Sequence, residues 1–432
     1  MVENATGFPD VKWSTPLSHL LPRDFALADD YYSSHITLED ALSHRSGLPR
    51  HDLAYGWDNA STIDVVRTMR HLPLTAEPRT RWQYCNLMYA AVGTIVERLT
   101  SDRLENVLRE WIWEPIGMRS TMFSPKAAQR SRYSNGQERL ARGYFWREDH
   151  YISEPYIDLE PLAGAGATIS SVNDYALWAQ ALLNAGVNHT SPMNGPLYQS
   201  VTAPRSIIAE SGSPSQSLPL LYALGWFLLM LGPHRVVTHG GSVVGFGAEM
   251  YILPDEGFAF VSVANTAGSS NQLGALLFLE VLKKTGILDA SISTTDTPWI
   301  NGHAVDSPIS GLRQSPISKS DEQTHANPAL PLPGRLKSYT GMYYNPGYGP
   351  TNVSVDGGAK ADSWGELTNP NVQQARMLLE EDGSQAVGVL HVQPSQRTWP
   401  WSLSLLHTTH TFFDAGIYVR PARDLKLIGI NQ

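Results

Sequence analysis

The pattern of apolar and polar positions is most informative between residues 235 and 264. Val236 and Val237 are β-branched, residues 248–253 are apolar, and residues 258–264 are apolar again. Glycines separate the first two runs, and a Pro-Asp-Glu-Gly turn at 254–257 separates the second from the third. Apolar runs of this length, broken by turn residues, predict three consecutive strands of a sheet.

The first predicted strand ends in His239-Gly240-Gly241-Ser242. Two glycines at the end of a strand let another backbone or a ligand come close, because no side chain intervenes. The same residues also suit an ordinary glycine bulge between core strands. The pattern alone leaves both interpretations open.

A first helix is predicted where Thr-Leu-Glu-Asp at 37–40 supplies an N-cap and an acidic first turn. Gly-Leu-Pro at 47–49 predicts that this helix ends at Gly47. His44 and Ser46 then lie at the helix C-terminus. Their residue types suit catalysis, but side chains at such an end more often bind loop backbone, and we prefer that interpretation.

A second helix is predicted after residue 86, since apolar residues at 88, 91, 92, 95, 96 and 99 share one helical face. Asn86 suits its N-cap. Tyr84 then lies just before the helix, where the positive end of the helix dipole favours a phenolate. The alternative is an ordinary tyrosine that packs on a helix start. Cys85, between these two residues, is expected to be a small buried apolar side chain.

The glycine-rich residues 161–171 lack the third glycine and the lysine of a phosphate loop, so they predict close packing instead. A helix follows them, and residues 273–284 predict another apolar helix with basic residues at its end. Residues 288–333 are rich in Ser, Thr and Pro and predict a linker.

Short apolar and aromatic runs predict strands in residues 334–432, and hence a small β-sandwich or barrel-like domain. The runs lie at 342–344, 387–392, 401–406 and 417–419. His407 and His410 have a spacing that suits metal ligands on a helix, but they fall in a strand, so we expect a surface strand and no metal.

The composition and charge of the sequence exclude several classes of protein. The 432 residues are 42% hydrophobic and 17% charged, which suits a soluble protein of two domains, or of one large domain with an appendage. The net charge of −9 argues against a nucleic-acid partner. A single cysteine excludes an internal disulfide framework, and neither a secretory signal nor an apolar run long enough for a membrane span is found. These features favour a cytoplasmic location, and no cofactor is predicted.

Three motifs occur in an order that resembles the penicillin-binding protein and class C β-lactamase family of serine hydrolases. They are residues 43–52 (Ser-His-Arg-Ser-Gly-Leu-Pro-Arg-His-Asp), Tyr84-Cys85-Asn86 and His239-Gly240-Gly241. Residues 161–171 are similar to the family's glycine-rich loop, and residues 222–226 to the strand before the His-Gly-Gly strand. The resemblance covers about residues 7–285 and is closest to fungal members.

The resemblance implies an α/β domain over residues 1–287, in which helices flank an antiparallel sheet, then the linker 288–333 and a β-domain at 334–432. It also implies catalysis through an acyl-enzyme, with an ester, lactone, amide or β-lactam-like small molecule as substrate. Such members are carboxypeptidases, esterases or acyltransferases, and fungal ones often belong to secondary metabolism.

By the same resemblance, Tyr84 is the general base, and it needs cationic neighbours because a free phenol is a poor base at neutral pH. Asn86 holds the substrate amide or the family's lysine. His239, Gly240 and Gly241 bind substrate, His239 standing where many members have lysine in Lys-Thr-Gly. Ser242 supplies a backbone N–H to the oxyanion.

The family's nucleophile motif, Ser-x-x-Lys, does not occur in the sequence, since no lysine has a serine three positions before it. Lys284-Thr285-Gly286 does not replace the substrate-strand motif, because it ends a predicted helix. In the family pattern the nucleophile motif lies about thirty residues before Lys12, which predicts an N-terminally incomplete domain without serine-dependent acyl-enzyme formation. A second hypothesis is a non-catalytic relative that keeps the cleft to bind a ligand. The coding sequence upstream of Met1 would distinguish the two.

Overall fold

The computed structural model of the protein describes residues 1–2, 4, 6–57, 59–133, 135–147, 150–185, 193–208, 220–266, 269–290, 336–355, 389–394, 401–409, 412–419 and 427–429. Most of the linker predicted at 288–333, and His410, lie outside the described residues. The boundaries predicted for the domains stay predictions.

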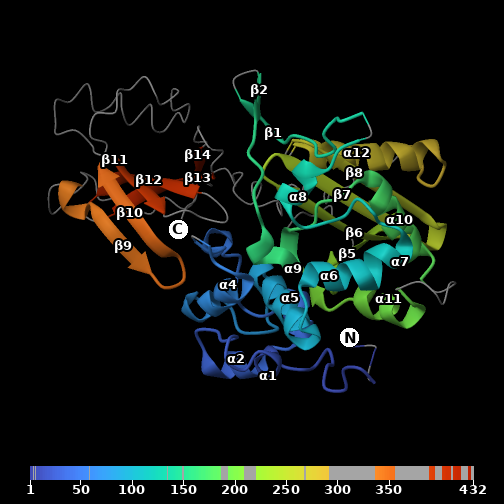
Figure 1. Ribbon diagram of the computed structural model, residues 1–432, viewed down its shortest axis with the longest axis horizontal. Helices are drawn as coiled ribbons and strands as arrows, with labels where there is room; N and C mark the ends of the chain where they lie inside the picture. The colour runs from blue at the N-terminus through green and yellow to red at the C-terminus, as the bar shows by residue number, and fades with distance from the viewer. Residues whose placement is uncertain are drawn as a thin grey trace.

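A six-stranded antiparallel sheet forms the centre of the larger part of the molecule, with the strand order β3-β4-β5-β6-β7-β8 (Figure 1). Its strands are β3 (Ser206–Ile207), β4 (Leu221–Tyr222), β5 (Phe227–Leu231), β6 (His234–Val243), β7 (Phe246–Leu253) and β8 (Phe258–Ala264). The last three are the strands that the apolar runs predict. Residues 223–226 form the turn between β4 and β5, not a strand as the resemblance suggested, and Gly225 enters it with a φ of +84°.

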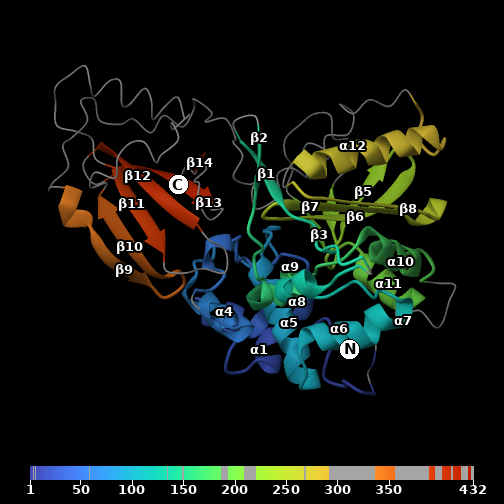
Figure 2. The same ribbon diagram turned by 45° about the horizontal axis from the view of Figure 1, so that its top comes forward.

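Helices cover both faces of this sheet, as Figure 2 shows for α12 on one side and α10 and α11 on the other. These helices are α10 (Val172–Leu183), α11 (Gly195–Thr202) and α12 (Ser269–Lys284). The Phe278 ring of α12 stacks on Tyr251 of β7 at 4.2 Å between centroids. The next residue, Ile252, packs on the opposite face with Leu182 of α10. Because successive strand residues point to opposite faces, β7 is buried on both.

The remaining helices surround the largest hydrophobic core. They are α1 (Leu17–Leu20), α2 (Asp30–His35), α3 (Leu38–Leu42), α4 (Thr62–Thr68), α5 (Asn86–Thr100), α6 (Leu104–Leu108), α7 (Glu114–Ile116), α8 (Pro125–Arg130) and α9 (Ala163–Gly166), with short turns η1 (Asp52–Ala54), η2 (Met69–His71), η3 (Arg109–Trp113) and η4 (Glu160–Leu162). Helix α9 lies against α5, because Gly164 and Gly93 let the two backbones meet. The close packing predicted for the glycine-rich residues is confirmed.

Helix α3 begins as predicted, with a capping box between Thr37 and Asp40, but it ends earlier. The helix stops at Leu42, and His44 takes a left-handed conformation with a φ of +57°. The Arg45 guanidinium turns back to bind Asp40 at 2.7 Å. A helix that reached Gly47 was therefore wrong, since the chain reverses at His44 to make this buried ion pair.

The C-terminal strands form one six-stranded antiparallel sheet in the order β14-β13-β12-β11-β10-β9. They are β9 (Gly341–Asn345), β10 (Gly349–Val355), β11 (Val389–Pro394), β12 (Trp401–Thr409), β13 (Phe412–Val419) and β14 (Leu427–Gly429), and η7 (Leu336–Tyr339) precedes them. Figure 1 shows this sheet beside the helical region, with its β9–β10 end nearest to α4. The four strand runs predicted there coincide with β9, β11, β12 and β13.

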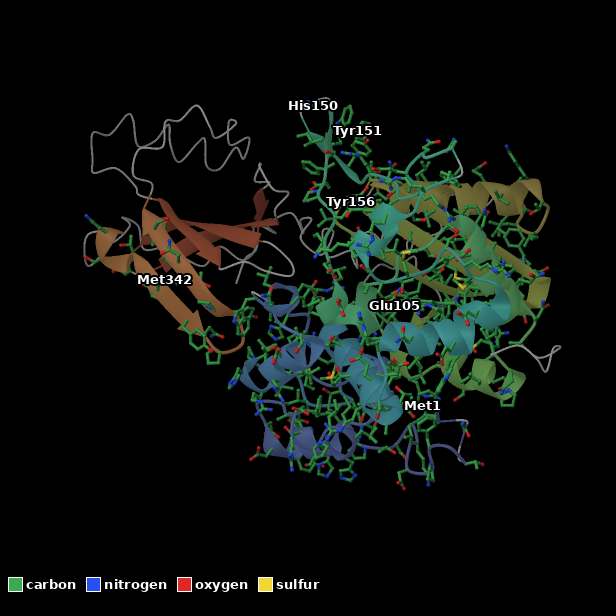
Figure 3. The ribbon with its side chains drawn as sticks, in the orientation of Figure 1. Met1, Glu105, His150, Tyr151, Tyr156 and Met342 are labelled. Carbon is green, nitrogen blue, oxygen red and sulfur yellow. The ribbon has the colours of Figure 1, made fainter. Side chains whose placement is uncertain are left out.

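A separate hairpin, β1 (Tyr144–Arg147) and β2 (His150–Ser153), projects from the larger part and carries His150 and Tyr151 outward (Figure 3). Within the described ranges, no helix has the length and apolar character that crossing a membrane requires.

Candidate active site

Tyr84 and Asn86 flank a buried cysteine at the start of helix α5. Cys85 is fully buried, and burial raises the pKa of its thiol to about 12, so it is a core residue as predicted. Asn86 was predicted as the N-cap, which is wrong, because Cys85 occupies that position and Asn86 is the first residue of the helix. Its side-chain amide instead donates a hydrogen bond of 2.9 Å to the Tyr55 hydroxyl.

The His44 ring packs against the Tyr84 ring, with 4.2 Å between the ring centroids. It is fully buried, and the Tyr89 and Tyr222 rings lie 5.1 Å and 4.9 Å from it. Its Nδ1 accepts a hydrogen bond of 3.0 Å from the Cys85 backbone N–H. This is the loop-backbone contact expected of a residue at this position, and it ties the end of α3 to the start of α5.

The His44 imidazole is uncharged. Burial, together with the nearby His239 and Arg50, holds its pKa well below the ordinary value. Because Nδ1 accepts a hydrogen bond, the ring proton of the neutral form is on Nε2, which is buried and has no hydrogen-bond partner among the described residues. The Tyr84 ring therefore packs against a neutral imidazole.

A cation also lies over the Tyr84 ring. The Arg50 guanidinium carbon lies 4.4 Å from the centroid of the Tyr84 ring. Arg50 is held by Asp52 at 2.9 Å, and Asp52 also accepts a hydrogen bond from Tyr55, which in turn binds Asn86. Burial disfavours the guanidinium charge, but Asp52 and its neighbours outweigh this and raise the pKa of Arg50. One network thus joins Tyr84 to Asn86.

His239 approaches Tyr84 from the sheet, with 6.3 Å between the ring centroids. Its Nδ1 donates to the Gly240 carbonyl at 2.6 Å, and its Nε2 accepts from the Tyr222 hydroxyl at 3.2 Å. Burial, opposed by the Gly240 hydrogen bond, lowers the pKa of His239. The strand therefore presents a neutral imidazole where a family member with Lys-Thr-Gly presents a cation.

The segment from His239 to Val243 forms one end of β6, and His239 at its start lies beside Tyr84. Strand β5 pairs with β6 only from His234 to Thr238, whereas β7 continues alongside as far as Val243. Among the described residues, this segment therefore has a strand neighbour on one side only. An unpaired strand edge offers backbone N–H and C=O groups to a ligand. The Ser242 backbone belongs to this edge, while its hydroxyl donates to the Phe246 carbonyl at 3.4 Å.

A buried carboxyl group lies behind the two glycines. Glu249 of β7 pairs with Gly240 and is 3% exposed. The Asn271 amide of α12 donates to Glu249 at 2.8 Å and to the Gly241 carbonyl at 3.0 Å. Burial raises the pKa of Glu249 to about 7, although its hydrogen bonds oppose this. Glu249 and Asn271 together hold β6 in place at Gly240 and Gly241.

The structure thus brings Tyr84, Asn86 and His239 to one place, and their roles stay predictions. Sequence reasoning gave no role to Arg50, Asp52, Tyr55 or Tyr222. Arg50 and Asp52 lie in the motif at 43–52, so the need of Tyr84 for a cation could have pointed to Arg50. Tyr222 belongs to the segment 222–226 that the resemblance matched, but nothing there gave it a role, and nothing in the sequence connects Tyr55 to the site.

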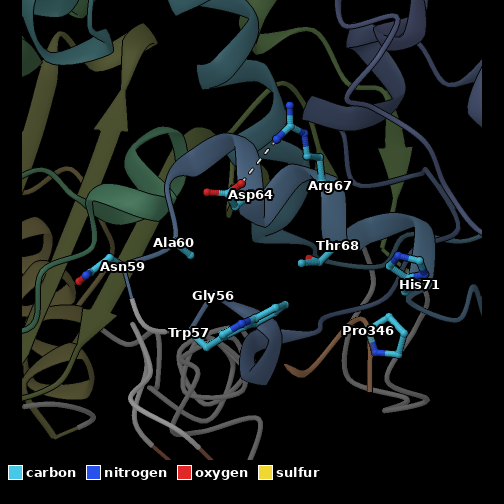
Figure 4. A pocket seen from close by; sticks show the side chains of 9 residues that line it. All are labelled: Gly56, Trp57, Asn59, Ala60, Asp64, Arg67, Thr68, His71 and Pro346. Atoms are coloured by element: carbon cyan, nitrogen blue, oxygen red, sulfur yellow. Dashed lines mark ion pairs between the residues drawn. The ribbon is translucent and has the colours of Figure 1, made fainter. Parts of the chain in front are cut away.

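A cavity of about 540 Å³ lies elsewhere, between the segment from Gly56 to His71, which includes α4, and the β9–β10 turn (Figure 4). Its lining is formed by Gly56, Trp57, Asn59, Ala60, Asp64, Arg67, Thr68, His71 and Pro346. None of the predicted site residues lines it. In the part of the chain that the structure describes, no group of three or more His, Cys, Asp or Glu is arranged to hold a metal ion.

A helix-flanked antiparallel sheet with a tyrosine facing a His-Gly-Gly strand edge defines the class of penicillin-binding-protein-like proteins. Residues 9–282 match the Beta-lactamase family, and the chain belongs to that family. The octameric penicillin-binding protein homologue from Pyrococcus abyssi has the same fold, with a TM-score of 0.55 at 15% identity over 99% of this chain and 83% of that chain.

Two curated fungal relatives are more similar in sequence. The unguisins hydrolase ungD' of Aspergillus campestris is 35% identical over 81% of this chain and 64% of its own length. The unguisins hydrolase ungD of Aspergillus violaceofuscus is 32% identical over 82% of this chain and 65% of its own length. The chain therefore spans less than two thirds of these relatives. A D-aminopeptidase of Cereibacter sphaeroides is 23% identical over 57% of this chain and 45% of its own length.

Proposed function

We propose that the chain carries the proton-transfer and substrate-binding parts of an acyl-transfer hydrolase site that acts on amide bonds. The observation that carries the proposal is the arrangement around Tyr84, whose ring contacts both the buried His44 ring and the Arg50 guanidinium and lies 6.3 Å from the His239 ring between centroids. Such an arrangement supports proton transfer, because a phenol can act as a base near neutral pH only when a cationic neighbour lowers its pKa.

In this proposal Tyr84 takes the proton of an attacking hydroxyl and returns it to the leaving amine. The positive charge of Arg50, 4.4 Å from the ring centroid, stabilises negative charge on the phenol. The Asn86 amide binds the substrate, and the backbone N–H of Ser242 stabilises the oxyanion. His239 is neutral, so it serves as a hydrogen-bonding and packing wall rather than as a second cation.

The acyl-enzyme route also needs a nucleophile. The sequence of 432 residues contains no Ser-x-x-Lys, and Ser242 is assigned to the oxyanion strand through its backbone. We therefore propose that turnover depends on a Ser-x-x-Lys segment in addition to these residues. Without such a nucleophile, about 10⁶-fold of rate is typically lost.

The proposed substrate class rests on the relatives. Two are named unguisins hydrolases, and a more distant one is a D-aminopeptidase. These names favour an unguisin-like secondary metabolite with an amide bond as the substrate. Esters, lactones and β-lactams use the same acyl-transfer chemistry and are the alternatives to compare.

The missing Ser-x-x-Lys favours a second candidate, a non-catalytic protein that binds a ligand in the same cleft. It keeps Tyr84, Asn86 and the His239 edge but has no acyl-enzyme step. The two candidates differ in whether any form of the protein turns a substrate over.

The test measures hydrolysis and binding together. The 432-residue chain, and a longer form if the coding sequence upstream of Met1 contains an in-frame Ser-x-x-Lys, are given an activated ester, a D-amino-acid amide and an unguisin. Calorimetry measures binding of the same amides. Turnover by the longer form alone supports the hydrolase, and binding without turnover by any form supports the binding protein. A fluorophosphonate label on one serine of the 432-residue chain, lost on denaturation, would show a nucleophile that the proposal lacks.

A further inference from the structure

The loop that carries Arg50 is bound on its far side by the C-terminal sheet. The Tyr348 hydroxyl, in the β9–β10 turn, lies 2.6 Å from Nδ1 of His51, across 297 positions of the chain. His51 lies between Arg50, which covers Tyr84, and Asp52, which holds Arg50. A contact from the C-terminal sheet therefore ends one residue away from the candidate site.

The direction of this hydrogen bond follows from the other ring nitrogen. Nε2 of His51 lies 3.1 Å from the Pro73 carbonyl, which can only accept, so Nε2 carries the proton. Nδ1 then accepts a hydrogen bond from Tyr348. Burial lowers the pKa of His51, against smaller opposing effects of Pro73 and Asp52, so the neutral form is present at neutral pH. Both nitrogens are satisfied, and the ring is fixed in one orientation.

The turn fits its docking surface closely. Gly347 and Gly349 are both buried, and a Cβ on either would stand 2.6 Å from a side-chain atom, Leu72 Cδ2 for Gly347 and Trp57 Cδ2 for Gly349. Asn345 accepts hydrogen bonds from the backbone N–H groups of Gly347 and Tyr348 and so shapes the turn. The glycines bring the backbone into contact, which places the Tyr348 hydroxyl on His51.

We propose that Tyr348 is a positioning residue of the candidate site. By fixing His51, it holds the segment in which Arg50 covers Tyr84 and Tyr55 binds Asn86. Docking of the C-terminal sheet thereby fixes the position of the Arg50 guanidinium over Tyr84. No described residue of that sheet contacts Tyr84, Asn86 or His239 itself. The inference rests on the proposed function for its effect on catalysis, whereas its structural part can be tested without turnover.

The test uses the full chain with Tyr348→Phe, which removes only the hydroxyl, and His51→Leu, which removes the acceptor of the same bond. Tyr344→Phe is the matched control, because Tyr344 is on the adjoining strand and 68% exposed. Hydrogen exchange is followed by mass spectrometry in peptides that cover residues 50–57 and 84–87. Thermal unfolding of each variant shows that it is folded.

We expect exchange in both segments to be about fivefold faster in Tyr348→Phe, as the loss of one neutral hydrogen bond implies, and at least as fast in His51→Leu. Exchange in α12 and in the Tyr344→Phe variant should not change. The His51 ring should also titrate at higher pH in Tyr348→Phe, since the lost bond stabilises its neutral form. Unchanged exchange at 50–57, or a change in that segment without one at 84–87, would overturn the inference.

Catalysis separates the two proposals. If a form of the protein turns substrate over, Tyr348→Phe should lower kcat about fivefold with little change in KM, because Tyr348 does not touch substrate. An unchanged kcat would overturn the positioning role even if exchange is faster. If no form turns substrate over, the proposed hydrolase fails, and hydrogen exchange alone decides whether Tyr348 positions the cleft.

Discussion

The carboxyl group of Glu249 occupies the space that a side chain on Gly240 would need. A Cβ on Gly240 would stand 2.5 Å from Oε1 of Glu249, and Asn271 and Tyr251 hold that carboxyl in place. At Gly241, by contrast, no atom of the described residues, apart from its chain neighbours, lies within 4 Å of the corresponding position. Of the two adjacent glycines, only the first is therefore required by packing.

The first prediction follows from this difference. Gly240→Ala should destabilise the protein by about 1–3 kcal/mol, as overpacking of a buried site does. Gly241→Ala is the matched control, and it should change the free energy of unfolding by less than about 0.5 kcal/mol. Urea unfolding measures both. In a double-mutant cycle, Glu249→Ala should relieve the cost of Gly240→Ala, and additive effects would contradict the steric explanation.

The second prediction concerns pH. The pKa of Glu249 is raised in the folded protein from 4.5 to about 7, so the folded state binds the proton more tightly than the unfolded state. Its contribution to stability is fully present below pH 4.5 and is lost as the pH rises through about 7. A shift of this size corresponds to roughly 3 kcal/mol.

Glu249→Gln keeps the hydrogen-bonding shape without the ionisation. The melting temperature of the wild type relative to this variant should therefore fall between pH 5 and pH 8.5. Glu154, whose pKa burial also raises to about 7, contributes to the same fall in both proteins and cancels in the comparison. A difference in melting temperature that is constant over this pH range would show that Glu249 does not ionise there.

The third prediction concerns His44, a non-glycine residue at a φ of +57°. Asparagine tolerates this conformation and can still accept the Cys85 N–H, whereas valine tolerates it poorly and cannot accept. His44→Val should cost about 2 kcal/mol or more, and His44→Asn clearly less. Thermal or urea unfolding measures the difference. Equal losses would mean that only the volume of the ring matters.

The fourth prediction applies to whichever form of the protein turns substrate over. Tyr84→Phe should lower kcat about 10²-fold or more, as expected when a positioned base is removed. Arg50→Lys should also lower kcat, by about tenfold, because the single ammonium group of lysine cannot both bind Asp52 and lie over the Tyr84 ring. Rates of amide hydrolysis check both. A Tyr84→Phe enzyme with full activity would remove the proton-transfer role.

Much of the larger part of the fold was predictable, because its elements have local patterns. The apolar runs of β6, β7 and β8 and the helical spacing of α5 and α12 each reflect burial on a defined face. The early end of α3 was not predictable, because it depends on Arg45 turning back to a buried Asp40. The N-cap assigned to Asn86 failed for a similar reason, since its amide binds Tyr55 from another segment.

The candidate site shows the same division. Tyr84 and His239 stand out by motif, and Arg50 and His44 lie in the motif at 43–52, but their contacts with Tyr84 and Tyr222 depend on the packing of separate segments. The contact of Tyr348 with His51 links residues 297 positions apart, and no spacing rule predicts such a pair.

The burial of the single cysteine has a practical consequence. Cys85 is the only thiol of the chain, and it lies at the joint between the His44 loop and helix α5. A thiol reagent can reach Cys85 only when that joint opens. The rate of labelling therefore measures how often the core of the site opens locally. The unmodified protein therefore carries its own reporter, in which ligand binding to the cleft would be seen as slower labelling at one atom.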